Sequence, residues 1–265
     1  MTETPPEPAV TVKPPSPENM GAELSIALNY LTRFNFSFKE APRPRLIRRS
    51  MVWFPLIGAA IGLCGGLIDW IMTAMRMPAV ITATAAVVGM LFFTRALHEQ
   101  EFASLIDHYG SGKDRPETVG WLKEERSVRS GTLGIIIIII LKIGAIASLA
   151  DNALVFQTLI VAGAWSRALM VVAAAWLRPI AGDPVADHFQ QPPAVRVVIA
   201  LAVGVLIAYA ALDEDTATTL TAGSLAGLIV ALVAANHLRG YNGALLGTLQ
   251  QVVEVTILGV ILALQ

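Results

Sequence analysis

Residues 98–130 contain the densest group of side chains that could carry out chemistry. His98 and Glu99 open this segment, and Asp107 follows Glu99 by eight residues. Because eight residues are close to two helical turns, both carboxylates could lie on one side of a helix, with His98 beside them. Carboxylate oxygens are preferred ligands of Mg²⁺, which suits a phosphorylated substrate. Two acidic residues at this spacing also occur on helix faces exposed to solvent, so a metal site and a solvated helix face both stay open.

Four ionisable residues lie inside long apolar runs: Asp69, Lys142, Arg167 and Glu254. A charge at the centre of a bilayer is unfavourable by at least ~2.5 kcal/mol unless it has a partner or faces water. Asp69 is close enough to the end of its run to reach the interface. Arg167 and Glu254 are central, so we expect them either to pair with each other or to line a cavity that accepts phosphate oxygens.

The composition predicts that membrane helices position these side chains. Of the 265 residues, 55% are hydrophobic and 15% charged, against roughly 25% charged in soluble domains. Runs long enough to cross a bilayer occur at about 51–72, 78–97, 131–150, 153–177, 195–212, 220–238 and 246–264. The sequence predicts an all-α integral membrane protein with about seven transmembrane helices. One cysteine and a net charge of −1 exclude a disulfide scaffold and a nucleic-acid partner.

The chain divides into a tail and one membrane domain. Residues 1–20 are rich in proline and lack an apolar stretch, so we expect a disordered tail. The membrane domain, 21–265, begins with a short interfacial amphipathic helix over 22–36, where Ile26, Tyr30, Leu31 and Phe34 follow helical spacing. Residues 98–130 are the one long connection. Their apolar side chains favour a functional loop, with an amphipathic linker helix on the bilayer surface as the alternative.

The distribution of basic residues predicts the orientation. With the N-terminus in the cytoplasm, sixteen lysines and arginines lie on the cytoplasmic side and only Arg76 on the other, whereas Lys142 and Arg167 lie within the membrane. Cytoplasmic flanks are enriched in basic residues. We therefore expect a multi-pass protein with its tail and the 98–130 loop in the cytoplasm. The acidic stretch at Asp213 is expected outside.

Seven short motifs occur in a fixed order through most of the chain after the tail. They are YLTRFNF from Tyr30, WFPLIGAAIG from Trp53, FTRALHE from Phe93, RSGTLG from Arg129, SRA from Ser166, LRP from Leu177 and GYNGALLGTLQQVVE from Gly240. Together they resemble the motifs of the cobalamin synthases, also called adenosylcobinamide-GDP ribazoletransferases. The ladder of apolar runs also matches that family.

The resemblance implies a Mg²⁺-dependent transferase of the bacterial inner membrane that completes the nucleotide loop of cobalamin. A hydroxyl of α-ribazole, or of its phosphate, would attack the cobinamide-bound phosphate of adenosylcobinamide-GDP and release GMP. Such phosphoryl transfer depends on positioning and on charge stabilisation. The implied partners are these two substrates and the lipid bilayer, and a homo-oligomer or a complex within the pathway stays open.

The matching motifs assign expected roles to residues of this chain. On the resemblance, His98, Arg129 and Arg167 act in catalysis, Arg95, Arg178 and Glu254 bind substrate, and Glu99 and Asp107 bind the metal.

Four positions depart from the family's motifs, and each departure removes a carboxylate. Where the family has aspartate, this chain has Gln100, Ser104, Ser127 and Ala244. Because Mg²⁺ depends on charge and on oxygen ligands, we expect weak Mg²⁺ binding. A catalytically impaired relative that binds a corrinoid or a pathway partner is therefore the main alternative.

A transporter is a weaker alternative. Arg167 and Glu254 would suit a solute path. However, the sequence lacks a pair of Gly- or Pro-broken spans in corresponding halves, which is typical of inverted-repeat carriers.

Overall fold

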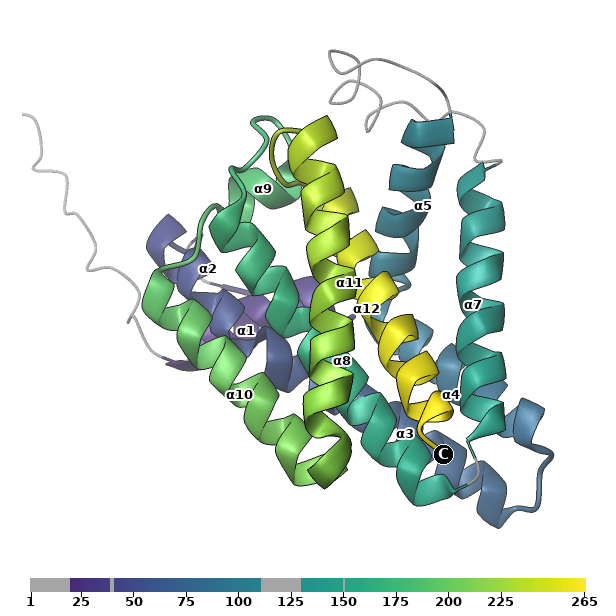
Figure 1. The fold of residues 1–265 in the computed structure, drawn as a ribbon. Coiled ribbons are helices and arrows are strands. Elements are labelled where there is room, and N and C mark those ends of the chain that lie inside the picture. Colours follow the sequence, from purple (N-terminus) through teal and green to yellow (C-terminus); the bar gives the residue numbers. More distant parts are fainter. Residues whose placement is uncertain (1–19, 39–40, 111–129, 150) are drawn as a thin grey trace, which may run out of the picture.

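The structure is a computed structural model that describes residues 20–38, 41–110, 130–149 and 151–265. Within these ranges the regular structure is helical (Figure 1), apart from an isolated bridge between Pro179 and Tyr241. The N-terminal half contains α1 (Met20–Leu31), α2 (Pro44–Ser50), η1 (Met51–Trp53), α3 (Phe54–Ala74), α4 (Ala79–Thr94) and α5 (Leu97–Gly110). The C-terminal half contains α7 (Ser130–Ser148), α8 (Asn152–Trp176), α9 (Pro184–Phe189), α10 (Ala194–Leu212), η3 (Asp213–Asp215), α11 (Thr216–His237) and α12 (Gly243–Ala263).

Each of the seven predicted apolar runs corresponds over most of its length to a helix of the described ranges, so the prediction of an all-α membrane bundle is confirmed. Five helical segments in the described ranges are long and apolar enough to cross a membrane, or six if the bent pair α4 and α5 forms one span. One of the five, Ala194–His237, contains both α10 and α11. Figure 1 shows these two helices meeting at a turn and running back toward the same end of the bundle.

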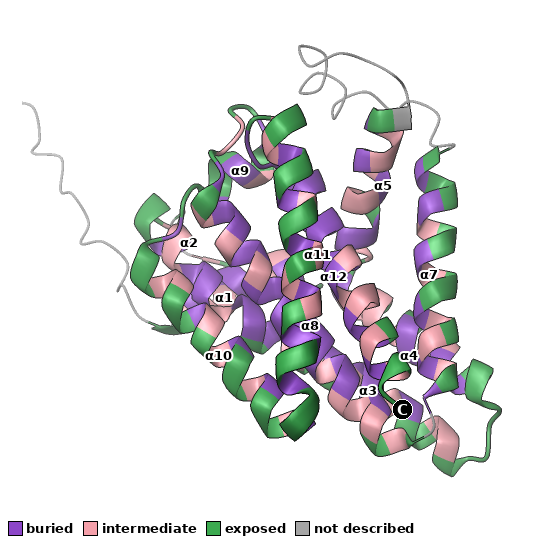
Figure 2. Cartoon of the chain, viewed as in Figure 1, coloured by how far each residue is buried: buried purple, intermediate pink, exposed green. Residues whose placement is uncertain are grey.

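Helix α8 is the centre of the bundle. Most of its residues from Val155 to Ala174 are buried, and Figure 2 shows more exposed residues on α7, α10 and α11. Its closest neighbour is α3, because glycines let the two backbones approach. A Cβ atom on Gly58 would overlap the carbonyl oxygen of Gly163, and one on Gly62 would overlap that of Leu159. Small residues at this spacing are typical of helix contacts in membranes.

The segment from 98 onward differs from the predicted loop. Residues 97–110 form α5, which packs against α12 and α7 inside the bundle. An 88° bend at Arg95 and Ala96 separates α5 from α4. Both residues have positive φ, 58° and 52°, so a sharp turn occurs without glycine or proline. The remainder of the predicted loop, 111–129, lies outside the described residues, as does the predicted tail at 1–19.

The N-terminal helix is shorter than predicted and is tied into the bundle. It ends at Leu31, so Phe34 follows the helix instead of extending it. Glu23 on its inner side is 1% exposed. Its carboxylate accepts bonds from both terminal nitrogens of Arg196, at 3.0 and 3.1 Å, and lies 2.8 Å from Nε of Arg49. These ion pairs join α1 to α2 and α10.

Candidate active site

A cluster of charged side chains lies at the meeting point of α5, α7, α8 and α12. Glu254 on α12 is its centre. One carboxylate oxygen, Oε1, accepts a hydrogen bond from Nη1 of Arg167 at 2.6 Å, and the other, Oε2, accepts one from Nζ of Lys142 at 2.7 Å. Of the two arrangements expected for Arg167 and Glu254, the structure therefore shows their pairing. Lys142 completes the arrangement as a second cation on the same carboxylate.

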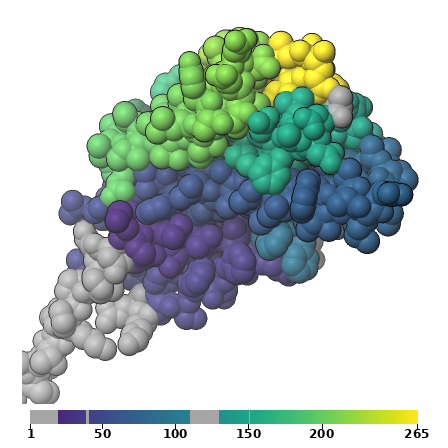
Figure 3. All heavy atoms as spheres, turned by 90° about the horizontal axis from the view of Figure 1, so that it is seen from below, coloured from purple at the N-terminus to yellow at the C-terminus, as the bar shows by residue number. Residues whose placement is uncertain are grey.

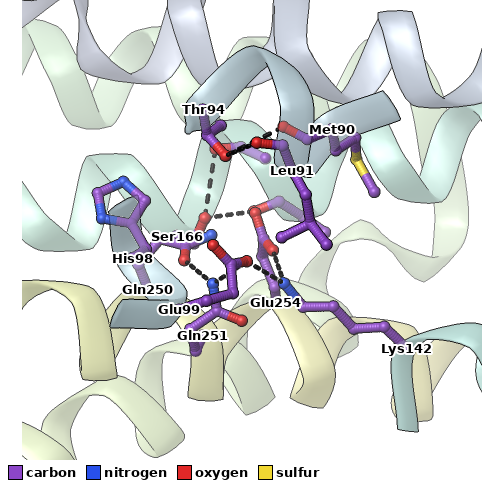
Figure 4. Close-up of polar contacts among 12 residues, drawn as sticks. Met90, Leu91, Thr94, His98, Glu99, Lys142, Ser166, Gln250, Gln251 and Glu254 are labelled. Atoms are coloured by element: carbon purple, nitrogen blue, oxygen red, sulfur yellow. Dashed lines mark hydrogen bonds and ion pairs between the residues drawn. The ribbon is translucent and has the colours of Figure 1, made fainter. Parts of the chain in front are cut away.

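Glu99 on α5 also belongs to this cluster. Its Oε1 accepts a hydrogen bond from Nε2 of Gln251 at 2.7 Å and lies 3.5 Å from Nζ of Lys142. Figure 4 shows the side chains of Glu99, Gln251, Glu254 and Lys142 pointing toward one another. Two carboxylates and two cations thus compensate one another in the bundle interior, as buried charges require.

A second chain of polar contacts begins at His98. Its Nδ1 lies 2.8 Å from Oε2 of Glu101, and Oε1 of Glu101 accepts a hydrogen bond of 3.2 Å from the hydroxyl of Tyr30 on α1. Burial and the neighbouring Glu101 carboxylate raise the pKa of Tyr30 well above its usual value, so its hydroxyl stays a donor. Against an ionised Glu101, which only accepts, Nδ1 is the donor, and this tautomer leaves Nε2 as the basic nitrogen of His98.

Glycines on α12 leave space for the Glu101 side chain of α5. A Cβ atom on Gly247 would overlap the Glu101 side chain, and one on Gly243 would lie 3.0 Å from its Oε1. Asn242 starts α12 by accepting the backbone N–H of Leu245 at 2.9 Å. The glycines of the 240–247 motif therefore hold α12 against the helix that carries the polar residues.

A small cavity of about 20 Å³ lies beside the charged cluster, lined in part by His98, Glu99, Lys142, Arg167 and Glu254. A cavity of this size accepts about one water-sized group. Nε2 of His98, Oε2 of Glu99 and Nε of Arg167 are all buried without a hydrogen-bond partner among the described residues. The cavity therefore suits one small polar group that could hydrogen-bond to these atoms.

The other residues with predicted roles lie apart from this cavity. Asp107 is near the far end of α5, where its Oδ1 accepts the backbone N–H of Gly131 at 2.7 Å and so caps α7. Arg95 is exposed at the bend and donates to the carbonyl oxygen of Asn29 at 3.2 Å. Arg178 is exposed after α8. Arg129 lies outside the described residues, as does Ser127.

The described residues do not form the Mg²⁺ site that the resemblance implies. Glu99 and Asp107 are bound to different partners, about 12 Å apart along the helix at 1.5 Å per residue. In the described ranges, no three side chains of His, Cys, Asp or Glu gather as metal ligands. Gln100 and Ser104 share the outer side of α5, and Ala244 is buried on α12.

Sequence reasoning missed Glu101 and left Lys142 without a role. Glu101 is three residues after His98, a spacing that brings side chains together on a helix. The signal was present, but it depends on α5 being a helix, whereas a loop was predicted. Lys142 was identified as an intramembrane charge, yet nothing in the sequence connects it with Glu254 over 112 residues.

Comparison with known proteins gives the family. The sequence profile described as cobalamin-5-phosphate synthase matches residues 23–262. An adenosylcobinamide-GDP ribazoletransferase of Bradyrhizobium diazoefficiens is 30% identical over 248 residues, covering 93% of this chain and 95% of the relative. One from Syntrophobacter fumaroxidans is 29% identical, covering 90% of this chain and 97% of the relative. No solved structure matches this chain. The chain belongs to the cobalamin-5-phosphate synthase family.

Proposed function

We propose that this chain is an adenosylcobinamide-GDP ribazoletransferase that acts in nucleotide-loop assembly in the bacterial inner membrane. Family membership supports the substrate class. The observation that carries the chemistry is His98, which is bonded to Glu101 through Nδ1 while its Nε2 is buried without a partner among the described residues. A histidine oriented by a carboxylate in this way is typical of a general base.

In the proposed reaction, a hydroxyl oxygen of α-ribazole attacks the phosphorus atom attached to cobinamide. A new P–O bond forms, the P–O bond to the departing GMP breaks, and the hydroxyl proton passes to Nε2 of His98. Glu101 is a positioning residue, because it fixes the ring and compensates the imidazolium that forms. The unpartnered Nε of Arg167 is available to donate to an oxygen of the transferred phosphoryl group.

Magnesium enters this proposal only as a weakly bound ion. Of the two expected ligands, Glu99 lies 3.5 Å from Nζ of Lys142 and Asp107 caps α7, so no reaction step is assigned to a metal. We expect Mg²⁺ affinity to be low, because each missing aspartate removes a hard ligand and a negative charge.

A catalytically impaired relative is the second candidate, and one observation favours it. Gln100, Ser104 and Asp107 follow one another at helical spacing along α5, yet only Asp107 is acidic and its carboxylate caps α7. In this candidate the chain keeps the fold and binds a corrinoid without turnover.

The deciding experiment measures GMP release. The purified protein in lipid receives adenosylcobinamide-GDP and α-ribazole, with and without Mg²⁺. Transferase activity predicts release of GMP together with formation of the cobalamin product. Absence of GMP, with corrinoid binding retained, would support the impaired relative instead.

The variants His98→Asn and Glu101→Gln test the assignment of the base. We expect His98→Asn to lower kcat by a factor on the order of 10² to 10⁴, as loss of a general base does. Glu101→Gln should lower kcat less and shift the pH–rate profile, because the ring loses its carboxylate. His237→Asn is the matched control, since His237 is exposed at the end of α11. Unchanged kcat in both site variants would refute the role of His98.

Restoring the missing acids distinguishes the two candidates further. The combined variant Gln100→Asp, Ser104→Asp, Ser127→Asp and Ala244→Asp should bind Mg²⁺ more tightly, measured by calorimetry. Each single change should help little, because an incomplete cluster cannot replace the water shell of the ion. If only the fourfold variant releases GMP, the natural chain is an impaired transferase. High activity of the unaltered chain would show that these positions do not limit the reaction.

A further inference from the structure

An apolar groove lies between α1, α3 and the end of α4. It has a volume of about 350 Å³, and its lining includes Leu24, Leu28, Leu56, Ala60, Cys64 and Phe93. This volume is in the range of small-molecule sites. Figure 3 shows the purple N-terminal segment lying along the blue surface of the segments that follow it.

The lining excludes a polar ligand. Thr32 carries the one side-chain hydroxyl in the lining, and this hydroxyl already donates to the carbonyl oxygen of Leu28 at 2.7 Å and accepts the N–H of Phe34 at 3.2 Å. A nucleotide or a corrinoid amide would therefore lose its hydrogen bonds with water in the groove and gain none. A hydrocarbon chain meets no such penalty.

Leu56, which lines the groove, lies on the exposed side of α3. Leu56, Leu63 and Leu67 are 46%, 38% and 42% exposed, and their spacing of seven and four residues places them on one side of the helix. Such a stripe on a membrane-spanning helix faces lipid chains. An acyl chain can therefore enter the groove from the bilayer.

Two arginines, Arg33 and Arg95, contact residues that line the groove or adjoin its lining. The guanidinium of Arg33 stacks 3.6 Å above the ring of Phe92, and its backbone N–H donates to the carbonyl oxygen of Phe93 at 2.8 Å. Arg95 bonds to the carbonyl oxygen of Asn29 at 3.2 Å. Both side chains are exposed, and neither forms an ion pair with a carboxylate in the described part of the chain.

We propose that this groove binds one anionic phospholipid, with an acyl chain between α1 and α3 and the phosphate at Arg33 and Arg95. Guanidinium groups bind phosphate oxygens in a two-pronged geometry, and basic sites between membrane helices select anionic lipids. The uncompensated charge of the arginines accounts for the selection, and the apolar lining accounts for the chain. The site is separate from the charged cluster, so it does not depend on the proposed transferase activity.

Lipid retention tests the proposal. The full chain is reconstituted in nanodiscs of equal parts phosphatidylglycerol and phosphatidylcholine, and lipids that stay bound are counted by native mass spectrometry. We expect one phosphatidylglycerol on the wild type. The double variant Arg33→Gln with Arg95→Gln should lower the preference by about thirtyfold, or about 2 kcal/mol. Arg76→Gln is the matched control, because Arg76 is an exposed arginine with positive φ that precedes α4, whereas Arg95 follows α4.

A second variant and a chemical probe examine the groove itself. Ala60 is exposed, so Ala60→Phe can fill the groove without disturbing the core, and it should abolish lipid retention. Cys64 is the one cysteine of the chain and lines the groove, so phosphatidylglycerol should slow its alkylation by N-ethylmaleimide. Equal lipid preference in wild type and double variant, or retention in Ala60→Phe, would overturn the proposal. Protection of Cys64 by α-ribazole but not by lipid would assign the groove to a substrate.

Discussion

At the scale of single residues, the stability of the charged cluster depends mainly on Glu254. It is the acceptor for both Lys142 and Arg167. Removing its charge leaves two cations in the bundle interior with only Glu99 nearby, 3.5 Å from Lys142. Breaking a buried ion pair by removing one partner typically lowers stability by about 3–5 kcal/mol.

We therefore expect Glu254→Gln to destabilise the protein strongly, on the order of 3 kcal/mol. Lys142→Met should be milder, because Arg167 still compensates Glu254. Thermal unfolding in one detergent measures both variants. Glu214→Gln is the matched control, since Glu214 is exposed in the turn between α10 and α11. Equal midpoints for Glu254→Gln and Glu214→Gln would show that the cluster contributes nothing to stability.

The residue scale also shows what the sequence can predict about the site. The sequence narrowed Arg167 and Glu254 to two arrangements, mutual pairing or a phosphate-accepting cavity, because central charges in apolar runs need a partner. The partners of His98 and Glu99 could not be predicted from the sequence. Glu101 and Gln251 meet these residues only because α5 bends into the bundle, and hydropathy does not predict that bend.

At the scale of helices, the glycines of α3 set the position of α8. Gly58 and Gly62 are four residues apart and face the backbone of α8, with no space for a methyl group. Since Arg167 is on α8, this contact also positions the charged cluster. Apolar periodicity alone would not identify the contact, because lipid and protein are equally apolar neighbours.

We expect Gly62→Ala to separate α3 from α8 and to lower the unfolding midpoint clearly, with a loss of about 1–3 kcal/mol as for other overpacked contacts. Gly144→Ala is the matched control, because a Cβ atom there meets nothing within 4 Å. The control should leave stability unchanged or raise it, since alanine favours helix over glycine by roughly 1 kcal/mol. Similar losses for both variants would indicate a general effect of glycine replacement.

The bend between α4 and α5 explains why one element was predicted incorrectly. Polar residues begin at His98, and this fall in hydropathy indicates the end of a membrane helix. Arg95 and Ala96 give no warning of a turn, because positive φ is rare for such residues. The chain instead turns by 88° and continues as a helix whose polar side chains find partners on α7 and α12.

At the scale of the whole molecule, composition was enough to predict a polytopic helical bundle. The outer surfaces of α7, α10 and α11 carry exposed leucine, isoleucine and valine, which a bilayer would cover. Which helix becomes central could not be predicted in the same way. The isoleucine run at 135–140 is apolar on all sides, so it does not indicate which side faces protein.

The orientation in the membrane stays a prediction, and the structure supplies two suitable probes. Tyr109 is 42% exposed near the end of α5, and Glu214 is exposed in η3. Figure 1 shows these helix ends at opposite ends of the bundle. Since sixteen basic residues are assigned to the side of Tyr109 and only Arg76 to the other, that end is expected in the cytoplasm.

Labelling in a Cys64→Ser background tests this orientation, because no other cysteine is present. A membrane-impermeant maleimide should react with Glu214→Cys in intact cells, where the outer end is accessible. It should react with Tyr109→Cys only in inverted vesicles or permeabilised cells. Cys64→Ser alone provides the background signal. The opposite labelling pattern would reverse the predicted topology, because the end that carries Tyr109 would then face outward.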